Sequence, residues 1–145
     1  MIELLAPAGD KDAFYAALGS GADAIYLGTD VLNARRGATN VSLSDLPELT
    51  RLAHLQDARL YLTVNTVVLD GECVQALELI AAAWEAGVDA IIIQDLGLLA
   101  LVRKHLPQVR LHASTQINTH NADTLRALAN LGVARVTLAR ELSLS

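Results

Sequence analysis

The sequence of 145 residues has one cysteine, three prolines and few aromatic residues, which make up 3 % of the chain. The single cysteine, Cys73, excludes an internal disulfide and cannot hold a metal cluster by itself. No apolar run reaches the length of about 18 residues that a membrane-spanning helix needs. No basic segment followed by a long apolar run opens the chain, so no signal peptide is predicted. These features favour a cytoplasmic protein without membrane partners.

Well-known catalytic motifs are missing as well. The sequence has no His-Glu-x-x-His zinc motif, no Cys-x-x-Cys pair, no phosphate loop and no Gly-x-Ser-x-Gly elbow. The formal charge of −5 argues against a general nucleic-acid coat, which must neutralise phosphates. One local basic spot remains, because Arg35 and Arg36 form an adjacent pair. We predict no metal site in this chain.

Short apolar runs alternate with helical stretches along the whole chain, and hydrophobic residues make up 52 % of it. The strand-like runs cover residues 2–6, 24–27, 60–64, 90–93, 109–111 and 136–138, and the helical stretches cover residues 11–20, 42–56, 70–86, 96–105 and 121–131. Asp10, Asp70, Asp95 and Asn121 are candidate N-caps. Gly21, Gly87 and Gly132 each stand just before a strand-like run, where glycine can end a helix in the left-handed conformation.

This alternation predicts a parallel α/β fold, and we expect a (β/α) barrel of TIM type truncated to about six β/α units. A closed barrel has eight strands and about 250 residues. We therefore expect residues 1–145 to be one domain, the N-terminal portion of a barrel in a fragment of a longer protein. A complete open sheet of flavodoxin type is the alternative.

Polar residues gather where the strand-like runs end, which in parallel α/β folds is where ligands bind. We predict a substrate site there, formed by Arg35, Arg36, Asn65, Gln94, Asp95, Ser114, Gln116, Asn118 and Arg140. The three arginines can grip an anion, and the amides can orient a planar group. Each residue also has a structural interpretation. Asp95 and Asn118 can be helix caps, and the arginines can be solvated charges or ion-pair partners.

Glu141 and His112 are the catalytic candidates, as acid or base. Glu141 can instead pair with Arg140, and His112 can be a hydrogen-bonded core histidine. Ser114 next to His112 is not a convincing nucleophile, because no third residue that would orient the pair is evident. Cys73 falls in a predicted helix and is expected to pack there.

Several blocks resemble the collagenase-like peptidases of family U32, in the same order along the chain. They are residues 3–9 (ELLAPAG), 21–28 (GADAIYLG), 33–40 (NARRGATN), 65–66 (NT), 94–97 (QDLG), 112–116 (HASTQ) and 140–144 (RELSL). The resemblance implies a barrel-like fold in a bacterial or archaeal cytoplasm. Some family members are called peptidases, and others hydroxylate RNA bases or a quinone precursor without oxygen.

The chain is most similar to the RNA-hydroxylating branch. That branch implies an iron–sulfur cluster of 4Fe-4S type, prephenate as the oxygen donor, and an RNA or small-molecule substrate for the full-length protein. Cys73 does not match a cluster cysteine of the family, so no cofactor is expected in this fragment, which should be inactive alone. The alternatives are a peptidase and a non-catalytic fragment that self-associates through its unpaired strand edges.

Overall fold

The computed structural model describes residues 2–33 and 41–143, which form strands and helices in alternation. The strands are β1 (Leu5–Ala8), β2 (Ala24–Gly28), β3 (Arg59–Val64), β4 (Ala90–Ile93), β5 (Leu111–Ala113) and β6 (Arg135–Val136). The helices are α1 (Lys11–Gly19), α2 (Leu46–His54), α3 (Cys73–Glu85), α4 (Leu96–His105) and α5 (Ala122–Asn130). Short 3₁₀ turns η1 (Leu43–Asp45), η2 (Asp70–Glu72) and η3 (Thr115–Ile117) precede α2, α3 and α5. In the described parts of the chain, every helix is too short or too polar to cross a bilayer.

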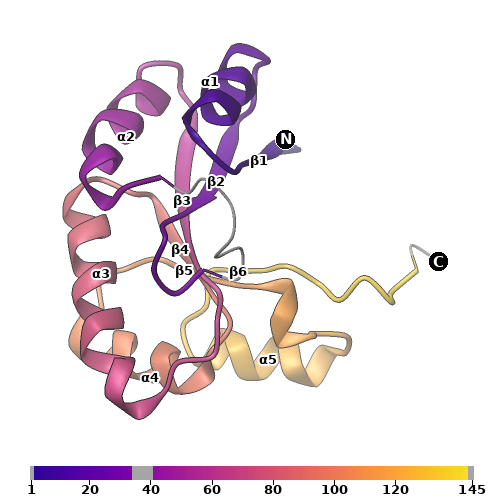
Figure 1. Ribbon diagram of the computed structural model, residues 1–145. Coiled ribbons are helices and arrows are strands. Elements are labelled where there is room, and N and C mark those ends of the chain that lie inside the picture. Colours follow the sequence, from indigo (N-terminus) through magenta and orange to yellow (C-terminus); the bar gives the residue numbers. More distant parts are fainter. Residues whose placement is uncertain (1, 34–40, 144–145) are drawn as a thin grey trace.

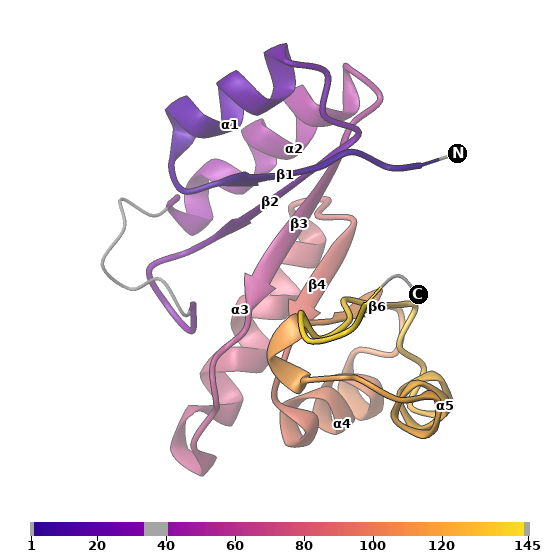
Figure 2. The same cartoon turned by 90° about the vertical axis from the view of Figure 1, so that its right-hand side faces the viewer.

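The strands form one parallel six-stranded sheet in the order β1-β2-β3-β4-β5-β6. The parallel direction predicted from the sequence is thus confirmed. The order excludes the flavodoxin alternative, in which the second strand lies at the sheet edge. Figures 1 and 2 show the helices following one another around one side of the sheet, which makes the molecule a half-barrel. β1 and β6 are the two edges of this sheet.

The two faces of the sheet have different compositions, because side chains alternate along each strand. On β3, Leu60, Leu62 and Val64 belong to the large hydrophobic core beneath the helices. Tyr61 belongs to a second, small cluster with Ala24 and Ala90 on the other face, which is the barrel interior. The apolar core therefore lies outside the barrel wall, and the inner face is available for polar groups.

Local signals in the sequence fix several element boundaries as predicted. The carboxylates of Asp10 and Asp95 cap α1 and α4, and the side chain of Asn121 caps α5. Gly21 and Gly87 adopt φ values of 81° and 90°, and Gly132 has φ 78°, so these turns use the left-handed conformation. Three turns of the same kind return the chain from a helix to the next strand.

Several predicted boundaries are wrong. α2 begins at Leu46 rather than at residue 42, and β6 is Arg135–Val136 rather than 136–138. β1 begins at Leu5 rather than at residue 2, because Leu4 is held by hydrogen bonds with Asp23 and Ala24 before the strand begins. β5 is Leu111–Ala113 rather than 109–111, since its partner β4 sets the register. Asp70 is not an N-cap but the first residue of η2. The N-cap of this turn is Leu69, whose backbone N–H donates to the carboxylate of Glu72.

Candidate functional site

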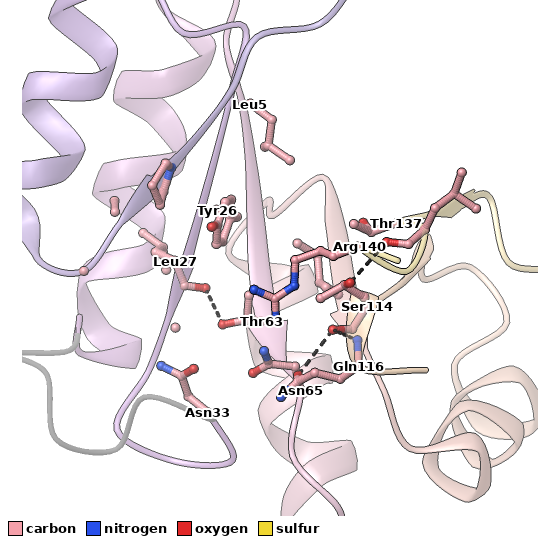
Figure 3. A pocket seen from close by; sticks show the side chains of 17 residues that line it. Leu5, Tyr26, Leu27, Asn33, Thr63, Asn65, Ser114, Gln116, Thr137 and Arg140 are labelled. Atoms are coloured by element: carbon pink, nitrogen blue, oxygen red, sulfur yellow. Dashed lines mark hydrogen bonds between the residues drawn. The ribbon is translucent and has the colours of Figure 1, made fainter. Parts of the chain in front are cut away.

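A pocket of about 550 Å³ opens on the inner face at the carboxyl ends of the strands. Figure 3 shows its lining side chains converging from several strands. The lining residues are Leu5, Pro7, Ala8, Gly9, Tyr26, Leu27, Gly28, Asn33, Thr63, Asn65, Ile92, Ser114, Thr115, Gln116, Thr137, Leu138 and Arg140. This is where parallel β/α folds bind their ligands.

The alternation of side chains along the strands places these groups in the pocket. Tyr26 and Gly28 reach it from β2, whereas Thr63 and Asn65 reach it from β3 and the residue after it. A Cβ atom at Gly28 would lie 2.0 Å from Nδ2 of Asn33 and 2.8 Å from Oγ1 of Thr63. Glycine at residue 28 therefore leaves the space that Asn33 occupies.

Hydrogen bonds fix the polar groups of the pocket wall. The Thr63 hydroxyl donates to the carbonyl of Leu27 at 3.0 Å. The Ser114 hydroxyl donates to Oε1 of Gln116 at 3.3 Å and accepts from the Gln116 backbone N–H at 3.2 Å. Thr115 donates its hydroxyl to the carbonyl of Leu138 at 3.1 Å. The β5 end and the segment after β6 are thereby held together along one side of the pocket.

Arg140 supplies the positive charge of the pocket. Among the lining residues that the structure describes, Arg140 is the one with a charged side chain. None of the others is a lysine, aspartate, glutamate or histidine. Its side chain points across the pocket in the direction of Thr63 and Asn65 (Figure 3). An arginine among carboxamides and hydroxyls suits an anionic group that carries further hydrogen-bonding atoms.

Four of the residues predicted for substrate binding come together in this pocket, namely Asn65, Ser114, Gln116 and Arg140. They come from three different strand ends, as the parallel sheet requires. The predicted pair Arg35 and Arg36 lies outside the described residues. Their role in binding an anion stays a prediction.

The other predicted site residues do not line the pocket. Gln94 and Asp95 follow β4, and Asp95 caps α4 by accepting from the Leu98 N–H at 2.8 Å. Its second oxygen accepts from the Val68 N–H at 3.2 Å, so this carboxylate joins two loops. Asn118 adopts the left-handed conformation after η3, and Glu141 is exposed after Arg140.

His112 lies on the inner face, beneath the pocket, and is 3 % exposed. Its ring meets the Tyr61 ring edge-on, with centroids 4.8 Å apart. Burial, followed by the charges of Arg135 and Arg110, lowers the pKa of His112 to about 4. The imidazole is therefore neutral at physiological pH. Its predicted role as acid or base, like that of Glu141, stays a prediction.

Sequence reasoning missed Tyr26, Thr63, Ile92 and Thr137 in the pocket wall. The signal was present, because counting back two residues from Asn65 reaches Thr63 on the same face of β3. A second missed group lies at the amino ends of the strands, where Glu3 contacts Arg59, Tyr61 and Arg135. Charged residues that begin strands, such as Arg59 and Arg135, are a weak signal for such a cluster.

The described residues offer no group of three or more metal-binding side chains. Cys73 is half-buried as the first residue of α3, and its thiol lies 3.6 Å from the carbonyl of Leu69. The cysteine content and the placement of Cys73 thus do not fit an iron–sulfur cluster within this chain.

A parallel β/α half-barrel with a polar pocket at its carboxyl ends defines a class of ligand-binding folds that is shared by many enzymes. The family model of peptidase family U32 matches residues 9–145, and this chain belongs to that family.

Among curated proteins, the chain is 41 % identical over 143 residues to the 23S rRNA 5-hydroxycytidine synthase of Escherichia coli, covering 99 % of this chain and 21 % of that protein. It is 34 % identical to the tRNA hydroxylation protein P of E. coli, covering 98 % of this chain and 31 % of the relative. A collagenase of Porphyromonas gingivalis is 36 % identical, with 98 % of this chain and 34 % of the relative covered. The chain therefore spans about a third or less of each of these relatives.

Solved structures support the fold. A U32 peptidase structure superimposes with a TM-score of 0.71 at 12 % identity, covering 95 % of this chain and 58 % of the other. Phosphonopyruvate hydrolase gives a TM-score of 0.62 at 19 % identity, covering 95 % and 54 %. At these identities the similarity concerns the fold alone.

Proposed function

We propose that this chain supplies the half-barrel and substrate pocket of a U32 protein that hydroxylates an RNA base. The main support is the pocket itself, in which Arg140 stands among Asn65, Gln116 and several hydroxyls. The arginine suits a phosphate or carboxylate, and carboxamides suit the edge of a base. Relatives named for rRNA and tRNA hydroxylation support the choice of RNA. Action on RNA would take place in the cytoplasm.

The proposal extends to the architecture. In the described residues the six-stranded sheet has two unpaired edges, and the chain covers about a third or less of the three relatives compared above. We propose that further strands outside this chain complete a barrel of TIM type, which has eight. The half-barrel alone would then be a substrate-binding part without activity of its own.

An iron–sulfur cluster and prephenate, which the family resemblance implies, remain part of the proposal for the full-length protein. Cys73 alone provides no ligand set for a cluster, so any cluster cysteines would come from outside this chain. We assign no reaction step of this chain to that group. Prephenate carries carboxylates, for which Arg140 is a fitting partner in the pocket.

A peptidase is the second candidate, and the relative named collagenase favours it. Peptide hydrolysis needs an activated nucleophile or water. The described pocket wall contains hydroxyls but no histidine or carboxylate that would activate them. The Ser114 hydroxyl is engaged with the side chain of Gln116 instead. The pocket therefore supports binding better than hydrolysis.

Deletion of the gene in its source organism tests the proposal. Nucleosides of rRNA and tRNA are then analysed by liquid chromatography and mass spectrometry. We expect the loss of one hydroxylated nucleoside and its return on complementation with the intact gene. Complementation with Arg140→Ala should restore little of it, because the anion loses its partner.

Arg126→Ala is the matched control, since Arg126 is an exposed arginine on α5 whose partner is Asp123. It should restore the nucleoside fully. An unchanged nucleoside profile in the deletion strain, together with gelatin cleavage by the purified full-length protein, would favour the peptidase instead.

A further inference from the structure

The pocket is bounded by both edges of the sheet. Leu5 and Pro7 on β1 form one side, and Thr137, Leu138 and Arg140, which follow β6, form the other. Within the described residues β1 pairs with β2 and β6 pairs with β5, and no strand ladder joins the two edges. The width of the pocket therefore depends on what fixes the separation of β1 from β6.

Side chains in the barrel interior make that connection. Both carboxylate oxygens of Glu3, just before β1, accept hydrogen bonds from the two terminal nitrogens of Arg135 at the start of β6. The Nη2–Oε2 distance is 3.1 Å, and Nη1 contacts Oε1. This bidentate pair joins residues that are 132 positions apart in the sequence. A bidentate arginine–carboxylate pair constrains orientation as well as distance.

The pair is continuous with the floor of the pocket. The Tyr61 hydroxyl donates to Glu3 at 3.2 Å, and the Arg135 guanidinium lies 5.5 Å from the centroid of the Tyr61 ring. Tyr61 is buried and packs in one cluster with Tyr26 and Ile92, which both line the pocket. A shift of Glu3 or Arg135 would thus reach the pocket through one aromatic ring.

The pair is charged in the folded protein. Hydrogen bonding with Arg135 lowers the pKa of Glu3, and the same bond raises the pKa of Arg135. The side chains are 21 % and 36 % exposed, so water reaches the pair only in part. A partly shielded, bidentate pair is better held than an exposed surface pair.

We propose that Glu3 and Arg135 are positioning residues that brace the two edges of the half-barrel and so set the width of the pocket. Neither residue lines the pocket, so both act through Tyr61 and the strands that they hold. The structural part of this inference is independent of the ligand. Its effect on substrate binding rests on the proposed RNA hydroxylation.

Distance measurements between spin labels test the brace directly in this chain. Labels are placed at Leu4→Cys on the β1 side and Leu131→Cys just before β6, in a Cys73→Ser background. Leu4 and Leu131 are 58 % and 42 % exposed, and neither lines the pocket. With Glu3 and Arg135 intact, and with the labelled protein diluted into an excess of unlabelled protein so that only distances within one copy are measured, we expect one narrow distance distribution. Arg135→Ala should broaden it and lengthen its mean.

Arg59→Ala is the matched control. Arg59 also contacts the Glu3 carboxylate, at 3.2 Å, but it belongs to β3 in the middle of the sheet. Its removal takes away a cation from Glu3 without breaking the link between the edges, so the distribution should stay narrow. Circular dichroism establishes that each variant is folded, and Glu3→Gln serves as a milder second variant that should broaden the distribution less than Arg135→Ala.

An unchanged distribution in folded Arg135→Ala and Glu3→Gln protein would overturn the brace. Equal broadening by Arg59→Ala would also overturn it, since the effect would then be a general loss of charge. In complemented cells, Arg135→Ala in the full-length protein should lower the hydroxylated nucleoside severalfold. If that nucleoside is absent even with the intact gene, the proposed function fails while the label distances still decide the brace.

Discussion

Asn33 occupies the space that a side chain at Gly28 would need. A Cβ atom there would lie 2.0 Å from the Asn33 amide nitrogen, far inside contact distance. This relationship ties the end of β2 to the loop that follows it, and it keeps both residues at the pocket wall.

Gly28→Ala should therefore push Asn33 out of its place and narrow the pocket. We expect a loss of about 1–3 kcal/mol in the free energy of unfolding, as for overpacked sites, measured by urea denaturation. Gly9→Ala is the control, because Gly9 lines the same pocket and a Cβ atom there would meet nothing within 4 Å. Equal stability of the two variants would contradict the close packing at Gly28.

Asp95 should matter for stability through its two hydrogen bonds. Asp95→Ala removes the cap of α4 and the bond to the Val68 N–H, and we expect a loss of about 1–2 kcal/mol. Asp123→Ala removes an equally charged residue whose side chain is 92 % exposed, and it should change stability by less than about 0.5 kcal/mol. Chemical denaturation of both variants measures the difference. If the Asp95→Ala variant were as stable as the unchanged protein, the role of Asp95 as a stabilising helix cap would be contradicted.

Protonation of His112 should make the protein less stable in mild acid. The folded state holds the pKa of His112 at about 4, below the ordinary histidine value of 6.5. Between these values the unfolded chain takes up a proton that the folded chain does not, so stability falls as the pH drops from 6.5 toward 4. The full effect is at most about 3 kcal/mol.

The comparison of His112→Gln with the unchanged protein isolates this contribution, since the carboxylates titrate in both. The difference in unfolding free energy should depend on pH between 6.5 and 4 and should level off at higher pH. Parallel stability curves over that range would show that His112 is protonated as easily in the folded state as in the unfolded chain.

Self-association of the half-barrel stays a prediction. β1 and β6 each leave one side unpaired in the described sheet, and Ile2 and Leu4 beside β1 are 94 % and 58 % exposed. We expect the β1 edge of one copy to meet the β6 edge of another, as unpaired strand edges tend to do. Sedimentation should show concentration-dependent oligomers that Leu4→Lys weakens. A monodisperse monomer at all concentrations would contradict this.

Much of the fold could be predicted because its signals are local. The continuous apolar run at Ala90–Ile93 and the cap at Asp95 gave β4 and α4 with their observed bounds. The starts of β1 and β5 were wrong because hydrogen bonds to a neighbouring strand decide them. Such registers depend on residues far away in the sequence.

The pocket could be predicted in part for the same reason. The rule that ligands bind at the carboxyl ends of parallel strands led to Asn65, Gln116 and Arg140. Asn118 has the same chemistry as Asn65, but it follows η3 with a left-handed backbone and does not line the pocket. The pair of Glu3 and Arg135 could not be foreseen, because the curvature that brings sheet edges together is a property of the assembled sheet.

The division of each strand into two faces has a consequence for how this protein can evolve. On β3, Leu60 and Leu62 hold the helices in place, whereas Thr63 and Asn65 meet the ligand space. Neighbouring positions on one strand thus have different roles. New substrate preferences can arise by exchange of inward residues while the outward ones continue to specify the same scaffold.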